Sequence, residues 1–567
     1  MTRQEMLRIL SFMEDMRAIT EKRTALSSVD ARWNIISYAM RRHLEGKLIT
    51  ITSAAMAAEV PYGTAMRRLN ELLDSEFLLK RPRSKSGKSF SLHPTRKLIR
   101  EFESFAMQLK TMVGGTFGFD TGDAAIEDFY FGGYYMAPRI LPYPNAMRDG
   151  VGYDRTIRIA ASLDPTFDTI RKHASDLGEL LGTRLEVVTL PLDALHAEIM
   201  ANAAKPNSAY DLVAVDLPWI GQLAEAGVIA PIDDILARER FNPSDFHGTA
   251  YTGSAWAGAQ YGLPIQPTSE LLFCRSDLFA AAGLPFPKTA KDVLIAAKVL
   301  HRSALNLSGI VMNYRRGTPV AHTFVQTLAS FGQPVIALTP VGDDFDLERI
   351  AGENFRPCLT SDAAFATADY LLELQRYAHP DSMICDWDRR IGIFSGGQAA
   401  MCYGWSVRAA AFELDDSSPA HQNVAFLPHP HGPGARTVSP IGGFSLAMPR
   451  GLSAPRQKAA WKVMEYLTRP EMLKWYVQHG NLTSPRFSTS ADPEVQAKSS
   501  LIGQVDAMER RGELQIWPRP PIPEFSDILG VLGDEIHRML QREIGVAEAL
   551  SRAQDRVDAL MRHNGRY

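Results

Sequence analysis

The segment Ile49–Pro94 has the sequence ITITSAAMAAEVPYGTAMRRLNELLDSEFLLKRPRSKSGKSFSLHP. Its first part is a short apolar run, 48–51, which we expect to be a strand. It leads into a helix that begins at Thr52 or Ser53, both residue types favoured at helix N-caps. A tight turn, Pro-Tyr-Gly at 61–63, then interrupts the helix. The pattern so far predicts a helix and a turn.

A second helix is predicted over 64–74, because apolar side chains recur there at helical spacing and form one buried stripe: Met66, Leu69, Leu72 and Leu73. Two β-rich runs follow, 77–79 and 89–92, joined by the basic loop KRPRSKSGK at 80–88. Helix, turn, helix and basic hairpin in this order predict a winged helix-turn-helix domain, mostly α-helical.

This segment is basic. From Pro61 to Arg100 there are ten Lys or Arg and three acidic residues. A major groove admits one helix whose outer side chains reach base edges, and a basic hairpin tip suits phosphates. We therefore expect DNA contacts from Thr64, Arg67, Arg68, Asn70, Arg81, Arg83, Lys85 and Lys88. The alternative is a solvated basic helix and loop with no ligand.

The same stretch resembles the MarR family of regulators. The sequence SLHPTRKL at 91–98 stands where that family has its last wing strand and the start of a dimerisation helix. The resemblance covers about residues 1–118 and implies a DNA-binding and dimerisation domain. The family's usual Asp-x-Arg at the wing tip is replaced here by RSKSGK at 83–88.

Three further helices with apolar faces are predicted around this domain, over 4–25, 30–45 and 95–112. Such faces need a partner to cover them. In MarR-like proteins the equivalent helices pair two protomers, so the resemblance implies a homodimer on double-stranded DNA. Packing of these helices against the rest of the same chain is the alternative.

Length and composition limit the number of domains and the kinds of site that the chain can contain. Its 567 residues suit two to four domains, or one bilobal unit with a smaller one. Residues 1–118 carry 20 Lys or Arg and 12 Asp or Glu, whereas the remainder carries 41 and 52, so a basic front precedes an acidic body. The four cysteines are scattered without ligand spacing, and neither a metal nor a cofactor is expected.

The chain shows no feature of a membrane or secreted protein. Its N-terminal residues carry charges throughout and lack a long apolar stretch, and no run of about 18 apolar residues occurs anywhere. We therefore expect a cytoplasmic protein without a membrane partner.

From Thr156 onward the pattern changes to alternating strands and helices: strands at 156–160, 185–190 and 211–215, helices at 167–182 and 192–202. This alternation predicts a parallel α/β layer. Residues 119–154, rich in Gly, Pro and aromatics, are predicted to be an ordered connector between a domain at 1–118 and another at 155–567.

This second part resembles the solute-binding proteins of ABC importers, especially their carbohydrate-binding branch. The matching landmarks are YDLVAVDLPWIGQLAEAGVIAPIDD (210–234), YGLPIQ (261–266), LPFPKT (284–289), FSGGQAAM (394–401), HPHGPG (429–434), GGFSLA (442–447), NLTSPR (481–486) and VAEALSRAQDRV (546–557). Ala290 departs from the pattern, because a Trp is usual there. The resemblance covers about residues 155–560 and implies a two-lobed, periplasmic-binding-protein-like α/β clamp that closes on a solute.

In open α/β sheets ligands bind beyond the carboxyl ends of strands. Aromatic rings that stack on a sugar, together with carboxylates and amides that bind hydroxyls, are the usual chemistry of such a pocket. The ligand-binding residues expected on this basis are Ser162, Asp164, Asp216, Trp219, Gln266, Thr268, Ser269, Trp387, Tyr403, Trp405, Gly442, Gly443 and Arg486. The pair His429 and His431 is interpreted as part of a surface loop.

The sequence contains no GxSxG, P-loop or HExxH motif, so catalysis is not expected. Together the two resemblances predict a one-component transcription regulator that senses a small solute. Two alternatives stay open. One is a cytoplasmic solute-binding module whose winged helix contacts protein, and the other is a carbohydrate-processing enzyme.

Overall fold

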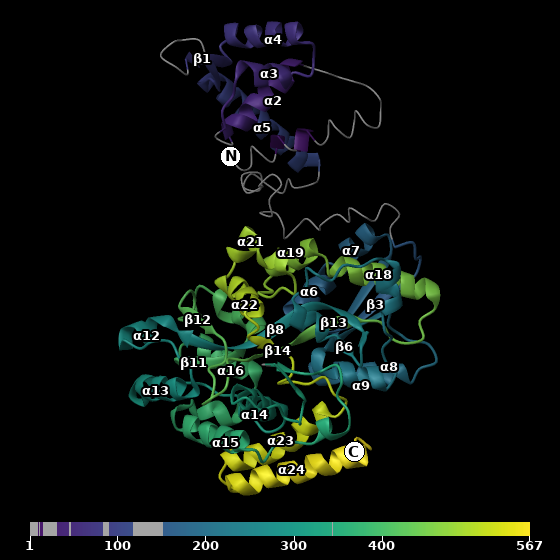
Figure 1. Ribbon diagram of the computed structural model, residues 1–567, viewed down its shortest axis with the longest axis vertical. Coiled ribbons are helices and arrows are strands. Elements are labelled where there is room, and N and C mark those ends of the chain that lie inside the picture. The colour runs from purple at the N-terminus through teal and green to yellow at the C-terminus, as the bar shows by residue number, and fades with distance from the viewer. Residues whose placement is uncertain are drawn as a thin grey trace. The chain divides into compact units, whose positions relative to one another are not determined.

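The computed structural model describes residues 9–10, 12–14, 31–44, 47–82, 90–116, 151–342 and 344–567 (Figure 1). The chain divides into two compact units, Met1–Ile140 and Leu141–Tyr567. Of the predicted connector 119–154, only residues 151–154 belong to the described part, and most of the predicted helix 4–25 also lies outside it.

The described elements of the first unit are α2 (Ala31–Leu44), α3 (Ile51–Met56), α4 (Tyr62–Asp74), β1 (Leu78–Pro82), β2 (Phe90–Pro94) and α5 (Arg96–Thr116). Strands β1 and β2 pair antiparallel. The predicted strand 48–51 is instead one bridge between Thr50 and Ser91. Thr50 is also the N-cap of α3, in a capping box with Ser53. The helix therefore begins before the predicted Thr52 because Thr50 satisfies its first N–H groups.

The core of this unit differs in part from the predicted stripe on α4. Ala65, Leu69 and Leu72 are buried, whereas Met66 and Leu73 are only partly buried. Ala65 lies on the inner face because α4 packs close to α2 and α3, where a small side chain fits.

The second unit begins with a parallel sheet. Strands β3 (Thr156–Ser162), β4 (Arg184–Leu190) and β5 (Leu212–Asp216) lie in the order β5-β3-β4. The predicted helix 167–182 is two helices, α6 (Pro165–Lys172) and α7 (Ala174–Leu181), which meet at His173. With α8 (Leu192–Ala203), α9 (Ile220–Glu225) and α18 (Ala454–Leu467) they surround β3 in Figure 1 and form the first lobe.

Two long strands continue this sheet into the second lobe. Strand β8 (Gly262–Arg275) is buried along its whole length and pairs antiparallel with β13 (Ser439–Ala447), which also pairs with β5. Gly443 has φ +94°, and a Cβ there would lie 2.0 Å from the carbonyl oxygen of Gln266. Only glycine therefore lets the two strands approach this closely.

The second lobe adds β11 (Met401–Trp405) and β12 (Val424–Leu427), both antiparallel to β8. Helices α14 (Thr318–Ser330), α15 (Asp362–Leu374), α23 (Phe525–Leu540) and α24 (Val546–His563) pack together along one end of the unit in Figure 1. Their apolar faces contribute to one hydrophobic cluster of the unit. Helix α16 (Trp387–Ser395) packs near β11.

The remaining elements are shorter or peripheral: α10 (Asp233–Arg238), α11 (Gly248–Thr252), β6 (Ala255–Trp256), β7 (Ala259–Gln260), α12 (Ser276–Ala282), α13 (Ala290–Leu300), β9 (Pro340–Val341), β10 (Asp344–Phe345), α17 (Ala410–Glu413), α19 (Pro470–Gln478), α20 (Phe487–Ser490), α21 (Pro493–Gln496), α22 (Ser500–Arg510) and β14 (Leu514–Gln515). Among the helices of the described residues, none is both long and apolar enough to span a bilayer. The two-lobed α/β architecture expected for this part of the chain is confirmed.

Candidate ligand-binding site

The residues expected to contact DNA lie partly on α4. Arg67 and Asn70 are exposed there, and Thr64 is half-buried. The guanidinium of Arg68 is held by Glu71 at 2.9 Å, so it is less available to a ligand than that of Arg67. Arg81 is exposed on β1, whereas the expected Arg83, Lys85 and Lys88 lie outside the described residues.

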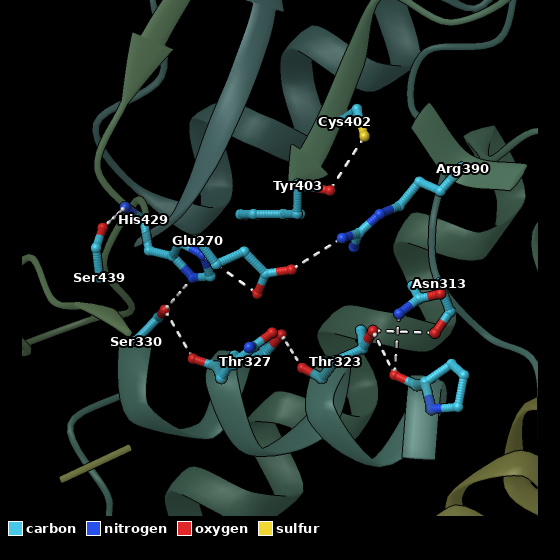
Figure 2. A network of polar contacts seen from close by, with 12 residues as sticks. Glu270, Asn313, Thr323, Thr327, Ser330, Arg390, Cys402, Tyr403, His429 and Ser439 are labelled. Atoms are coloured by element: carbon cyan, nitrogen blue, oxygen red, sulfur yellow. Dashed lines mark hydrogen bonds and ion pairs between the residues drawn. The ribbon is translucent and has the colours of Figure 1, made fainter. Parts of the chain in front are cut away.

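The centre of the second unit holds a buried ion pair that the sequence did not reveal. Glu270 lies on β8 directly opposite Trp405 on β11. Nη2 of Arg390, on α16, donates to Oε1 of Glu270 at 3.0 Å, and the two side chains are 1% and 3% exposed (Figure 2). Burial raises the pKa of Glu270, and the Arg390 charge opposes this shift.

Two histidines adjoin this pair: His322 belongs to α14, and His429 lies in the loop between β12 and β13. His429 lies 3.2 Å from the hydroxyl of Ser330, and its ring is 4.7 Å from that of Tyr403 (Figure 2). Burial, together with Arg390, lowers the pKa of His429 to about 3. Burial lowers the pKa of His322 well below its usual value, with Arg519 and Arg390 acting in the same direction. Both rings are therefore neutral at physiological pH.

Arg519 joins the two lobes. Its Nη2 lies 3.3 Å from Oδ2 of Asp216, at the end of β5, and its guanidinium lies 5.0 Å from the ring centre of Trp405. A Cβ added to Gly442 would lie 2.0 Å from Nη1 of Arg519, so glycine there makes room for the guanidinium. We call Asp216, Glu270, His322, Arg390, Trp405, His429 and Arg519, together with the buried Gln326 one turn along α14 from His322, the central polar cluster.

Several buried atoms of this cluster have no hydrogen-bond partner within the described part of the chain: Nε of Arg390, Nε of Arg519, Nε2 of Gln326, Nε2 of His429 and both ring nitrogens of His322. Buried polar groups in proteins are almost always paired, and leaving one unpaired costs on the order of 1–3 kcal/mol. Unpaired buried atoms are therefore concentrated in this cluster, which makes it the candidate site for a bound molecule.

The expected residue Asp164 is the N-cap of α6. Its Oδ1 accepts from the backbone N–H groups of Thr166 and Phe167 at 2.8 and 3.1 Å. The residue as a whole is partly exposed, but Oδ2 is buried without a partner in the described part of the chain. Burial raises the pKa of this carboxyl to about 7.

Replacing Asp164 by Asn should make stability less dependent on pH. A free aspartate has a pKa near 3.9, so between about pH 4 and pH 7 the folded state holds a proton that the unfolded state has lost. Stability therefore falls as pH rises through this window. Asn keeps the cap acceptor but does not ionise. We expect the Tm of the unmodified protein to fall relative to that of Asp164→Asn between pH 4.5 and pH 8.

Thermal unfolding at stepped pH measures this difference. Asp492→Asn is a matched control, because Asp492 caps α21 but has Lys474 at 2.6 Å. Parallel Tm curves for Asp164→Asn and the unmodified protein would contradict the assignment.

The structure brings some of the expected ligand residues to the cluster and leaves others elsewhere. Asp216, Trp405 and Gly442 belong to it or adjoin it. Trp387 and Tyr403 flank it: the ring of Trp387 is 5.8 Å from that of His322, and Tyr403 lies against His429. Ser162 and Gln266 are buried on β3 and β8, with no side-chain contact to the cluster among those described.

The other expected residues have structural partners. The hydroxyl of Ser406 lies 3.1 Å from that of Thr268 and accepts from the backbone N–H of Ser269 at 3.0 Å. The ring of Trp219 packs on His196 at 4.8 Å. Gly443 allows the close approach of β8 and β13 described above. The guanidinium of Arg486 donates to the carbonyl of Thr468 and to Asp245, and it lies 3.7 Å from the ring centre of Phe246.

Sequence reasoning missed Glu270, His322, Gln326, Arg390 and Arg519. One signal was available, because Glu270 is a lone carboxylate in the otherwise uncharged run PIQPTSELLFC at 264–274. The interpretation of His429 as part of a surface loop is wrong. It is 3% exposed, because the loop folds back under β13 and its N–H donates to the hydroxyl of Ser439. In the described residues no group of three or more His, Cys, Asp or Glu could hold a metal ion.

Comparison with known proteins gives a consistent result. Residues 162–474 match the family of bacterial extracellular solute-binding proteins. An ABC transporter solute-binding protein of Agrobacterium radiobacter K84, solved with ribitol, is 25% identical, with a TM-score of 0.64 over 72% of this chain and 98% of that one. Maltose-bound MalE3 of T. maritima is 18% identical, with a TM-score of 0.61 over 71% and 99%.

A solute-binding protein of Agrobacterium vitis S4 with bound D-mannitol is 20% identical, with a TM-score of 0.59 over 72% of this chain and 99% of that one. Among curated proteins, a binding protein of Brucella abortus (strain 2308) is 26% identical over 137 residues, which make up 24% of this chain. That match spans only 32% of the Brucella protein's own length.

Proposed function

Because the chain belongs to the family of bacterial extracellular solute-binding proteins, we propose that its second unit binds a small sugar or polyol, and that this binding controls DNA binding by the first unit. The chain is a binding protein and not an enzyme. The observation that carries the ligand part is the central polar cluster, whose buried atoms lack partners. The ribitol complex of the Agrobacterium radiobacter protein supports a polyol.

The proposed switch follows from where Arg519 lies. It contacts Asp216 of the first lobe and Trp405 of the second, so a ligand that binds Arg519 favours the closed arrangement of the lobes. Closure changes DNA affinity only as far as the ligand binds the two states differently. A coupling free energy of about 1–3 kcal/mol corresponds to a 5- to 150-fold change in DNA affinity, which is enough for a regulator.

The DNA part of the proposal rests on α4, which presents Arg67 and Asn70 to solvent beside the β1–β2 hairpin, in the element order of a winged helix-turn-helix. We propose that the protein acts in the cytoplasm. We also propose that it is a homodimer, because two recognition helices double the phosphate contacts and fit a two-fold operator. Anisotropy titration of a mixed-sequence duplex tests this part. Phosphate contacts make affinity fall between 50 and 200 mM salt, whereas a module that binds only protein shows no duplex binding.

Replacing Arg67 by Ala should weaken duplex binding more than replacing Arg68. Arg67 is exposed, whereas the guanidinium of Arg68 is held by Glu71. Replacing Arg67 therefore removes a side chain that is more available to DNA than that of Arg68. We expect Arg67→Ala to reduce the slope of log affinity against log salt by about 1. Arg184→Ala, an exposed arginine of the second unit, is the matched control. Equal slopes for Arg67→Ala and the control would rule out α4 as the DNA-binding helix.

A further inference from the structure

The unpaired atoms of the central polar cluster are unevenly divided between donors and acceptors. Nε of Arg390, Nε of Arg519 and Nε2 of Gln326 can only donate. The neutral ring of His322 adds one donor and one acceptor, and the role of Nε2 of His429 depends on its tautomer. Donors therefore outnumber acceptors even if His429 is counted as an acceptor.

Each carboxylate of the cluster already accepts from a guanidinium group, and Oε2 of Glu270 also lies 3.8 Å from Nε2 of His429. Glu270 accepts from Arg390, and Asp216 accepts from Arg519. A ligand hydroxyl that accepts from one of the unpaired N–H groups also brings its own proton, which needs an acceptor. A carboxylate or phosphate oxygen accepts without bringing a proton. An acceptor-only group therefore fits these donors better than a hydroxyl does.

The charges of the cluster allow such a ligand. Two guanidinium groups lie in it, and the two carboxylates that balance them are buried, which raises the pKa of both Glu270 and Asp216. The two neutral histidines add no charge. Neither the carboxylates nor the histidines make the cluster strongly negative, and charge-assisted hydrogen bonds from arginine to an oxyanion are among the strongest that proteins form.

We infer that the ligand is a polyol that carries an oxyanion, a carboxylate or a phosphate, whose oxygens accept from the unpaired N–H groups of Arg390, Arg519 and Gln326. This inference rests on the proposed function, because it names the class of solute that the same site takes. It places the oxyanion beside α14, where Gln326 lies one helical turn from both His322 and Ser330. The polyol chain then faces Trp405 and Trp387.

Isothermal titration of the full chain with two matched panels tests the inference. The neutral panel is sorbitol, mannitol, ribitol and maltose, and the anionic panel is the corresponding aldonates and sugar-alcohol phosphates. We expect at least one anion to bind ten times more tightly than its neutral counterpart, and the comparison of aldonate with phosphate identifies the oxyanion. Neutral compounds that bind as tightly as their anions would overturn the inference but leave the proposed solute binding intact. No binding in either panel would overturn both.

A variant of α14 gives an independent measurement. Gln326→Leu removes one unpaired donor at nearly constant volume, so the unliganded protein should keep or raise its Tm. We expect its affinity for the anion to fall at least tenfold and its affinity for the neutral counterpart to fall less. The matched control is Gln333→Leu, just beyond the end of α14, where Nε2 donates to the carbonyl of Pro334. An equal loss for anion and neutral compound would show that Gln326 does not bind an oxyanion.

Discussion

Replacing Glu270 by Ala is expected to lower the free energy of unfolding of the second unit by about 3–5 kcal/mol, because it leaves the charge of Arg390 buried without its partner. Both side chains are almost completely excluded from water, so solvent cannot replace the lost carboxylate. The pair also joins β8 to α16, which are 120 residues apart in sequence. Thermal or urea unfolding of the single variant measures the loss.

Two further variants test whether the unpaired charge of Arg390 causes the loss of stability. Glu270→Leu combined with Arg390→Met removes both charges at similar volume and should regain most of the lost stability, because replacing a whole buried pair by apolar residues is often neutral. Glu186→Ala breaks the exposed pair of Glu186 with Arg158, also at 3.0 Å, and should cost less than about 1 kcal/mol. If Glu270→Ala costs no more than Glu186→Ala, the buried pair does not stabilise the fold.

Replacing Trp405 by Ala is expected to weaken ligand binding by about 30-fold or more, since truncating a buried aromatic anchor at the centre of a binding site commonly costs about 2 kcal/mol or more. The ring lies at the end of β11, 7% exposed, and holds the guanidinium of Arg519 on its face. Its removal takes away the apolar face on which a sugar ring or polyol chain packs, and also frees Arg519.

Titration calorimetry with the tightest-binding compound of the two panels measures this loss. Trp405→Phe should retain part of the affinity, because it keeps an aromatic face. Trp256→Ala is the matched control, since Trp256 lies half-buried on the short strand β6 and has no described contact with the cluster. An unchanged Kd for Trp405→Ala would exclude the central polar cluster as the ligand site.

Local sequence patterns were enough to predict much of the architecture. The alternation of strands and helices after Thr156 predicted a parallel layer, which β3, β4 and β5 form, but it did not predict their order. The periodicity from Ile49 to Pro94 placed α3, α4 and the hairpin within a few residues of their observed bounds. These features depend on interactions between residues that are close in the sequence, and the spacing of apolar residues reflects such interactions. The predicted bounds were wrong at Thr50, where a capping box begins α3, and at His173, where one predicted helix is divided into α6 and α7.

For the site, the sequence predicted ligand residues at strand ends, and the structure places three of these, Asp216, Trp405 and Gly442, in or beside the central polar cluster. It did not predict Glu270, His322, Gln326, Arg390 and Arg519, nor the burial of His429. These side chains meet only because β8, α14, α16 and the segment before α23 converge in space, and Arg519 lies 303 residues from Asp216 along the chain. A charged residue in a sequence looks the same whether water or a buried partner surrounds it. Only the tertiary structure decides which charges and ring nitrogens are removed from water, because desolvation depends on segments that are distant in the sequence.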